Sequence, residues 1–248
     1  MRKGASSVGP LAWARRTTLR ARSQMSASRD HAHDLRRGDA VVPEVVKQSV
    51  RSALSPVVRV AIALHLTPNT ITVIGLFITV VASVLVANGF LLIGAAVLTA
   101  GSLFDAVDGA LARAQGGGTA FGSFLDSTLD RASEAILYAG IAAWFLAVLE
   151  DPSLAVIAVI VALTGSFLVS YSRARAEGIG LSASVGLAPR TERLVLVIVG
   201  IALAGLGFTA VLIGIIVLIA GLTVITTIQR IRHVWRLSQA APDPKKEH

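Results

Sequence analysis

The sequence predicts an all-α membrane protein: a bundle of six transmembrane helices preceded by an amphipathic helix at the membrane interface. Hydrophobic residues make up 54% of its 248 residues, charged residues only 15%, and the mean hydropathy is +0.70. This composition is too apolar for an ordinary soluble domain. Six apolar stretches follow residue 67, each near or above the ~20 residues that cross a bilayer. Lys and Arg are confined to alternate loops, as expected when successive helices cross.

Residues 1–42 are predicted to form a disordered basic arm, to which we assign no chemistry. Its basic residues include Arg2, Lys3, Arg15, Arg16, Arg20 and Arg22, all ahead of the first acid, Asp30. An Arg-rich, acid-free leader is also typical of organelle transit peptides, and a true start at Met25 is a further interpretation. The chain has no cysteine, which excludes disulfides and thiolate metal sites.

Residues 43–66 are predicted to form a juxtamembrane amphipathic helix. Its apolar face would comprise Val46, Val50, Leu54, Val57, Ala61 and Leu64, and its polar stripe Lys47, Arg51, Ser55 and Arg59. A cationic helix of this kind lies in the membrane interface rather than across it. Pro56 would kink it. The alternative is an ordinary surface helix.

The transmembrane domain is predicted to occupy residues 67–237, and residues 238–248 a disordered tail. The expected spans are 70–88, 90–114, 120–148, 153–175, 189–205 and 208–232. A helix breaker ends each of the first three spans: Asn88-Gly89, the glycines at 116–118, and Glu150-Asp151-Pro152.

Arginine placement predicts the orientation. The loops at 88–90, 149–153 and 205–208 contain no Lys or Arg. The opposite end receives the N-terminal arm and Arg113, Arg173, Arg175, Arg190, Arg193, Arg230 and Arg232. The positive-inside rule then places both termini on the cytoplasmic side of a multi-pass membrane protein. The net charge of +8 needs no nucleic-acid partner, because anionic membrane lipids account for it.

Four aspartates interrupt the second and third spans: Asp105, Asp108, Asp126 and Asp130. A carboxylate at the membrane centre costs ~2.5–3.5 kcal/mol, so four together require a compensating partner. The i, i+3 and i, i+4 spacings put each pair on one helix face, and the turn at 114–119 would bring the two helices together. Carboxylate oxygens without His or Cys favour Mg²⁺, Mn²⁺ or Ca²⁺.

Three neighbours extend this acidic pattern. Gly109 and Gly122 remove side chains beside the aspartate pairs, which permits close helix packing or close approach of a ligand. Arg113, one turn nearer the water, could hold a phosphate bidentately or serve as a topology anchor.

The segment Asp105-x2-Asp108-Gly109-x2-Ala112-Arg113-x8-Gly122-x3-Asp126-x3-Asp130 resembles the complete signature of the CDP-alcohol phosphotransferases. Eight specified positions over 26 residues make the signal specific, and the resemblance extends over roughly 43–236. It implies a homodimer of six-helix subunits, consistent with the count above.

The resemblance implies residue roles in a Mg²⁺- or Mn²⁺-dependent transfer from CDP-diacylglycerol. Asp105, Asp108 and Asp126 would hold the first metal, and Asp105, Asp126 and Asp130 a second. Asp130 would also act as general base toward the acceptor hydroxyl. The CDP-lipid site would comprise Pro68, Asn69, Thr70, Ile71, Gly109, Arg113 and Thr119. The alternative for the Pro68 segment is a proline-led helix start with a polar cap.

A second basic group would select the acceptor. It comprises Arg173 and Arg175 at the end of the fourth span, Arg190 and Arg193 at the start of the fifth, and Arg230 near the end of the sixth. The sequence around Ser170, Arg173, Arg193 and Arg230 is similar to that of actinobacterial phosphatidylinositol-phosphate synthases, where these positions would bind the acceptor phosphate; the similarity implies a protein of the bacterial plasma membrane. The departure is Arg173, where that group commonly has lysine. For any single arginine, topology anchoring is the competing interpretation, although three helices with arginine at one depth can build an anion pocket.

The expected reaction joins the phosphatidyl group to inositol phosphate. The nearest alternative acceptor is glycerol 3-phosphate, as in phosphatidylglycerophosphate synthases. A membrane prenyltransferase would place its two Asp-rich motifs far apart in sequence, whereas one turn separates them here. A cation transporter would account for the aspartates but not for Arg113 or the second basic group.

Overall fold

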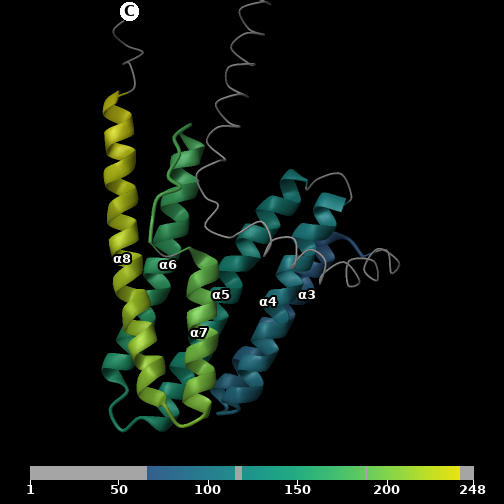
Figure 1. Ribbon diagram of the computed structural model, residues 1–248, viewed down its shortest axis with the longest axis vertical. Helices are drawn as coiled ribbons and strands as arrows, with labels where there is room; N and C mark the ends of the chain where they lie inside the picture. Colours follow the sequence, from purple (N-terminus) through teal and green to yellow (C-terminus); the bar gives the residue numbers. More distant parts are fainter. Residues whose placement is uncertain (1–65, 115–118, 188, 241–248) are drawn as a thin grey trace, which may run out of the picture. The chain divides into compact units, whose positions relative to one another are not determined.

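Six helices form the described part of the chain, and no strand occurs in it (Figure 1). The structure, a computed structural model, describes residues 66–114, 119–187 and 189–240; within them, the side chains of 103–114 and 240 are not described. The helices are α3 (Pro68–Ala87), α4 (Leu91–Ala114), α5 (Ala120–Val148), α6 (Ser153–Gly178), α7 (Arg190–Gly205) and α8 (Thr209–Ala240). The predicted arm (1–42), interfacial helix (43–66) and residues 241–248 of the predicted tail lie outside the described residues.

Two helices begin with the same local device. The Thr67 side chain accepts a hydrogen bond from the backbone N–H of Thr70 (3.2 Å), and Pro68 occupies the start of α3. Thr119 caps α5 in the same way, through the N–H of Gly122 (2.9 Å). A hydroxyl cap satisfies one of the N–H groups that a helix leaves unpaired at its first turn.

The helices match the predicted spans to within two residues, except at two ends. Helix α6 continues to Gly178 and α8 to Ala240, beyond the expected ends at 175 and 232. No proline follows in α8 until Pro242, so local sequence does not stop it earlier. At the start of α6, hydrogen bonds from the Ser153 side chain and backbone N–H lower the pKa of Asp151, in the loop before the helix.

Four of the six helices are long and apolar enough to cross a membrane by length and composition: α3, α5, α6, and α8 over Thr209–Gln239. In α4 the apolar segment covers only Leu91–Ser102. Helix α7 has 16 residues, about 24 Å at 1.5 Å per residue, which is shorter than expected for a spanning helix. The reason is visible in the sequence: both helices carry their charged residues at one end.

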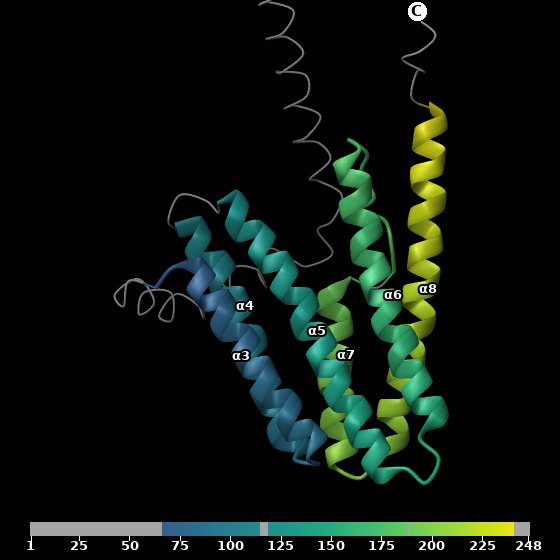
Figure 2. The same cartoon turned by 180° about the vertical axis from the view of Figure 1, so that it is seen from behind.

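The helices close into a ring in the order α3, α4, α7, α8, α6, α5, each packing against the next, and α5 against α3. Figures 1 and 2 show α6 beside α8, and the turns joining α3 to α4, α5 to α6 and α7 to α8 at one end. Helices α5 and α7 are not one of these closely packed pairs within the described residues. Side chains from α5 and α7 therefore meet across the interior of the ring.

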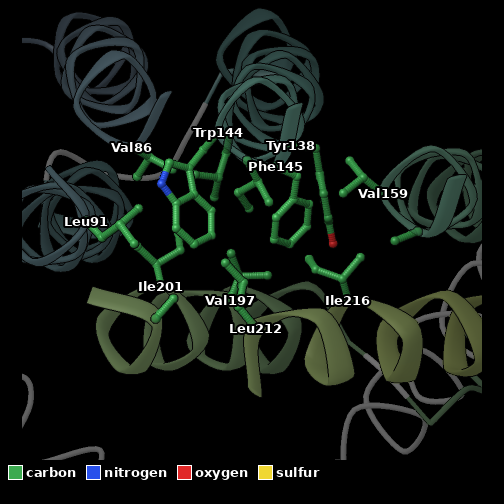
Figure 3. Close-up of a cluster of buried hydrophobic side chains, with 14 of the residues drawn as sticks. Val86, Leu91, Tyr138, Trp144, Phe145, Val159, Val197, Ile201, Leu212 and Ile216 are labelled. Atoms are coloured by element: carbon green, nitrogen blue, oxygen red, sulfur yellow. The ribbon is translucent and has the colours of Figure 1, made fainter. Parts of the chain in front are cut away.

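The interior of the ring is an apolar core (Figure 3). Its buried side chains include Val86, Leu91, Tyr138, Phe145, Val159, Val197, Ile201, Leu212 and Ile216, which come from all six helices. Large hydrophobic residues also cover the outside: Phe77 is 71% exposed and Leu154 79%. Apolar side chains on both the inside and the outside are the pattern of a helix bundle in lipid.

Small residues allow two close helix contacts. A Cβ added to Gly140 of α5 would meet the backbone of Ser83 in α3, whose hydroxyl donates to the carbonyl of Ile136 (2.6 Å). A Cβ added to Gly165 of α6 would lie 2.7 Å from the Cβ of Thr223 in α8. Close approach at small residues is how membrane helices commonly pack.

Candidate functional site

The predicted general base, Asp130, lies on α5 between two arginines. Its side chain is 17% exposed. Oδ1 is 2.8 Å from Nη1 of Arg190 on α7, and Oδ2 is 3.4 Å from Nη2 of Arg131. Asp126, one turn earlier, is exposed. The Asp130 carboxylate thus has a cation beside each of its two oxygens.

The other half of the predicted metal site lies on α4. The α4 backbone is helical through Ala114, so the one-turn spacing of Asp105 and Asp108 holds. The side chains of Asp105, Asp108, Gly109 and Arg113 lie outside the described residues. Among the side chains that are described, no group of three His, Cys, Asp or Glu converges. The four-aspartate cluster therefore stays a prediction, although the donor chemistry fits a hard divalent cation.

The first turns of α3 and α5 meet where the CDP-lipid site is predicted. A Cβ on Gly122 would lie 3.0 Å from Oδ1 of Asn69 and 3.1 Å from Oγ1 of Thr119. The glycine at position 122 thus leaves room for the side chain of Asn69. Two helix N-termini at one place also favour negative charge.

The other members of the Pro68–Ile71 segment differ in burial. Ile71 is buried, at 2% exposure, and anchors the segment in the bundle. Pro68 is half-buried and Thr70 exposed. The Thr70 hydroxyl lies 2.9 Å from that of Thr67. The segment is therefore fixed on its apolar side and open on its polar side.

Arg193 of α7 lies inside the bundle, with 2% of its surface exposed. Its Nε and Nη2 donate to Oε1 of Glu134 on α5, at 3.3 and 2.9 Å. Helix α7 runs from its open first turn into the core, and Arg193 is the buried member of that turn. The predicted acceptor-phosphate arginine thus already has a carboxylate partner.

Arg230 of α8 is buried as well, at 7% exposure. Its Nε donates to the carbonyl of Val185 (2.8 Å), in the segment between α6 and α7. Its Nη1 donates to the carbonyl of Val169 in α6. Arg230 therefore ties α8 to α6 and to the α6–α7 segment, a structural task that the sequence does not indicate.

The two remaining predicted acceptor residues lie on α6. Arg173 is exposed and pairs with Glu177 one turn later (2.9 Å). Ser170 is half-buried and its hydroxyl donates to the carbonyl of Ser166 (3.1 Å). The charges of Arg173 and Arg193 both act on Arg230, so the three guanidiniums form one basic region even though each has its own partner.

Sequence reasoning missed Glu134 as a site residue, and it placed Arg190 in the second basic group without indicating its contact with Asp130. The available signal was periodicity: Asp126, Asp130 and Glu134 place a carboxylate every four residues along one face of α5. Arg190 and Arg193 repeat with a spacing of three on α7. The sequence could reveal each series, but only the fold shows that the two series pair across the ring.

A small cavity lies beside these ion pairs. Its volume is ≈ 40 Å³. The residues that line it come from four helices and include Thr79, Ser102, Ser133, Glu134, Tyr138, Arg190 and Arg193. The polar end of the bundle thus continues inward as a pocket with both charges and hydroxyls.

Comparison with known proteins gives consistent matches. The model of the CDP-alcohol phosphatidyltransferase family matches residues 65–228. The phosphatidylinositol phosphate synthase of Corynebacterium glutamicum is 40% identical over 181 residues, 72% of this chain and 82% of that protein. The archaetidylinositol phosphate synthase of Methanothermobacter thermautotrophicus is 36% identical over 197 residues, 77% and 97% of the two chains.

Solved structures of the Mycobacterium tuberculosis phosphatidylinositol phosphate synthase are also similar. The structure with CDP-DAG bound superposes with a TM-score of 0.68 and 37% identity, covering 73% of this chain and 93% of that one. The structure with manganese and citrate gives a TM-score of 0.69 and 36% identity, covering 73% and 88%. With the aspartate pattern, the helical fold and these matches together, the chain belongs to the CDP-alcohol phosphatidyltransferase family.

Proposed function

We propose that this chain transfers the phosphatidyl group of CDP-diacylglycerol to inositol phosphate, giving phosphatidylinositol phosphate and CMP. The proposal rests on the match to a phosphatidylinositol phosphate synthase solved with CDP-DAG. The two chains are 37% identical, and the match covers 93% of that synthase. The M. thermautotrophicus relative is named for another lipid but also for inositol phosphate, which supports inositol phosphate as the acceptor.

In the proposed reaction, Asp130 removes the proton from the acceptor hydroxyl. The acceptor oxygen then forms a bond to the phosphorus that carries diacylglycerol, and the bond from that phosphorus to the CMP oxygen breaks. Arg190 (2.8 Å) and Arg131 (3.4 Å) flank Asp130, and the Arg190 contact would loosen as Asp130 accepts the proton. A base within hydrogen-bond reach contributes ~10²–10⁴-fold to such a step.

The residues proposed to hold divalent metal are Asp105, Asp108 and Asp126 for a first ion, and Asp105, Asp126 and Asp130 for a second. Manganese in a similar solved structure supports Mg²⁺ or Mn²⁺. When bound, such ions neutralise charge on the pyrophosphate and the leaving CMP. The exposure of Asp126 gives an ion access to α5.

The CDP-lipid is proposed to lie at the junction of α3 and α5. Asn69 and Thr119 line this junction around Gly122, with Pro68, Thr70 and Ile71 in the first turn of α3 and with Gly109 and Arg113 on α4. The side-chain amide of Asn69 offers both a donor and an acceptor to a cytosine ring. The helix N-termini favour the adjacent phosphates.

The acceptor phosphate is proposed to bind at the basic region of Arg173, Arg193 and Arg230, with Ser170 nearby. The charges of Arg173 and Arg193 both act unfavourably on Arg230, and a bound phosphate would offset this repulsion. Serine and inositol carry no phosphate group that would pair with these guanidiniums.

In the membrane, all six helices are proposed to cross. Helix α4, with 24 residues, is about 36 Å long, and its apolar first half together with its functional second half spans the bilayer. Helix α7 is short because its charged first turn contributes to the site. Both termini and the site would face the cytoplasm, and two such chains would form a homodimer.

An acceptor panel tests the proposed function. Purified protein with Mg²⁺ and CDP-diacylglycerol is offered inositol phosphate, glycerol 3-phosphate, inositol or serine, and CMP release is measured. We expect release with inositol phosphate. Release with glycerol 3-phosphate alone would instead identify a phosphatidylglycerophosphate synthase, and no release with any acceptor would favour the cation-transporter alternative.

Arg193→Ala refines the test of the acceptor end. We expect a larger rise in the KM for inositol phosphate than in the KM for CDP-diacylglycerol. The control is Arg232→Ala, which removes an exposed arginine from α8. An unchanged acceptor KM would leave Arg193 with a structural or topological role.

A further inference from the structure

Glu134 carries a buried carboxylate that lies one turn beyond the last aspartate of the family pattern. Its side chain is 10% exposed. Oε1 accepts both hydrogen bonds from Arg193, and Oε2 is buried without a hydrogen-bond partner in the described part of the structure. Burial of a carboxylate with one unpaired oxygen costs free energy, so the stability of the bundle alone does not explain a glutamate at this position.

The Glu134–Arg193 pair crosses the interior of the ring. Helices α5 and α7 are not close neighbours in the described residues, and the pair joins them in register with Asp130–Arg190 one turn away. A guanidinium is planar and has five N–H donors. Bonds from Nε and Nη2 to a single oxygen of Glu134 fix that plane.

The cavity of ≈ 40 Å³ lies beside the pair, and Glu134 lines it. Each water needs roughly 10–15 Å³ measured in this way, so the cavity has room for about three or four. A water here would satisfy the buried Oε2 of Glu134.

We propose that Glu134 is a positioning residue for the acceptor phosphate: it fixes the guanidinium of Arg193 in the orientation that binds inositol phosphate. The inference rests on the proposed function. Without Glu134, the guanidinium of Arg193 would lose the two hydrogen bonds that fix its plane and would turn more easily toward Asp130, one helical turn from Glu134, where it would compete with Arg190. Glu134 thus holds Arg193 where it binds the acceptor phosphate and leaves Asp130 to act as the base.

The test compares Glu134→Ala, Arg193→Ala and the double variant by steady-state kinetics. We expect Glu134→Ala to raise the KM for inositol phosphate about tenfold, as for loss of one charge-assisted hydrogen bond, with the KM for CDP-diacylglycerol within about twofold. Because Glu134 acts through Arg193, the double variant should show the same acceptor KM as Arg193→Ala alone. Glu134→Asp, which keeps the charge, should recover most of the affinity.

Two controls separate positioning from folding. Glu192→Gln removes a carboxylate from the residue next to Arg193, but an exposed one, and should leave both KM values unchanged. If Glu134→Ala does not fold, Glu134→Gln, of similar volume, replaces it. The double variant removes both charges and leaves no buried cation unpaired. Calorimetric titration of the protein with inositol phosphate alone should show a Kd shift of the same size.

The outcomes are distinct. The inference would be overturned if Glu134→Ala left the acceptor KM and Kd unchanged. It would also be overturned if the fold-rise in acceptor KM of the double variant equalled the product of the two single fold-rises. An equal rise in both substrate KM values would reduce Glu134 to a structural residue. If the unaltered protein releases no CMP with inositol phosphate, the proposed function fails first.

Discussion

Replacement of Arg230 tests how the bundle is tied together at its polar end. Arg230→Ala removes two hydrogen bonds from a charged donor, to the carbonyls of Val185 and Val169. Hydrogen bonds to charged groups contribute ~1.5–3 kcal/mol each, so the loss should be about 3–6 kcal/mol. For a chain of this length, about 2–4 °C per kcal/mol converts this to a fall of roughly 6–24 °C in the apparent melting temperature.

The measurement is thermal unfolding in detergent at one fixed scan rate, since unfolding of such proteins is often irreversible. Arg230→Lys keeps the charge but has no planar fork to reach two carbonyls, so it should recover less than half of the loss. Arg232→Ala, exposed on the same helix, should shift the melting temperature by less than about 2 °C. A melting temperature for Arg230→Ala equal to that of Arg232→Ala would refute the reasoning.

Three further predictions concern catalysis and packing. Asp130→Asn should reduce CMP release by ~10²-fold or more while CDP-diacylglycerol still binds; normal turnover would contradict its role as the base. Chelation of divalent metal should stop CMP release, and added Mg²⁺ or Mn²⁺ should restore it; activity that persists in chelator would contradict the metal assignment. Gly165→Ala should destabilise the protein by about 1–3 kcal/mol through overpacking against Thr223, whereas Gly221→Ala, which meets nothing within 4 Å, should not.

The sequence predicted the helices well because their signals are local. Apolar length, glycine and proline breakers, and hydroxyl caps such as Thr119 all act within a few residues of the chain. The family was also predictable, since its pattern is confined to two successive helices, and the comparisons confirm it. The described residues form six helices, of which four are long and apolar enough to cross a membrane.

The acceptor end was less predictable. Ser170, Arg173, Arg193 and Arg230 are spread over three helices, and the sequence indicates only that they share one end of the bundle. Their individual partners depend on the order of helices in the ring. Glu134 reaches Arg193 because α5 faces α7 across the interior, and no periodicity within either helix indicates that arrangement.

The sequence by itself therefore determined the class of protein, the helices and the aspartates proposed to do the chemistry, because each depends on spacing along one or two adjacent helices. Only the tertiary structure decided which carboxylate meets which arginine: Asp130 with Arg190, and Glu134 with Arg193. The physical reason is range. Helix propensity and periodicity act over a few residues, whereas an ion pair between residues 59 positions apart forms only after the ring of helices has closed.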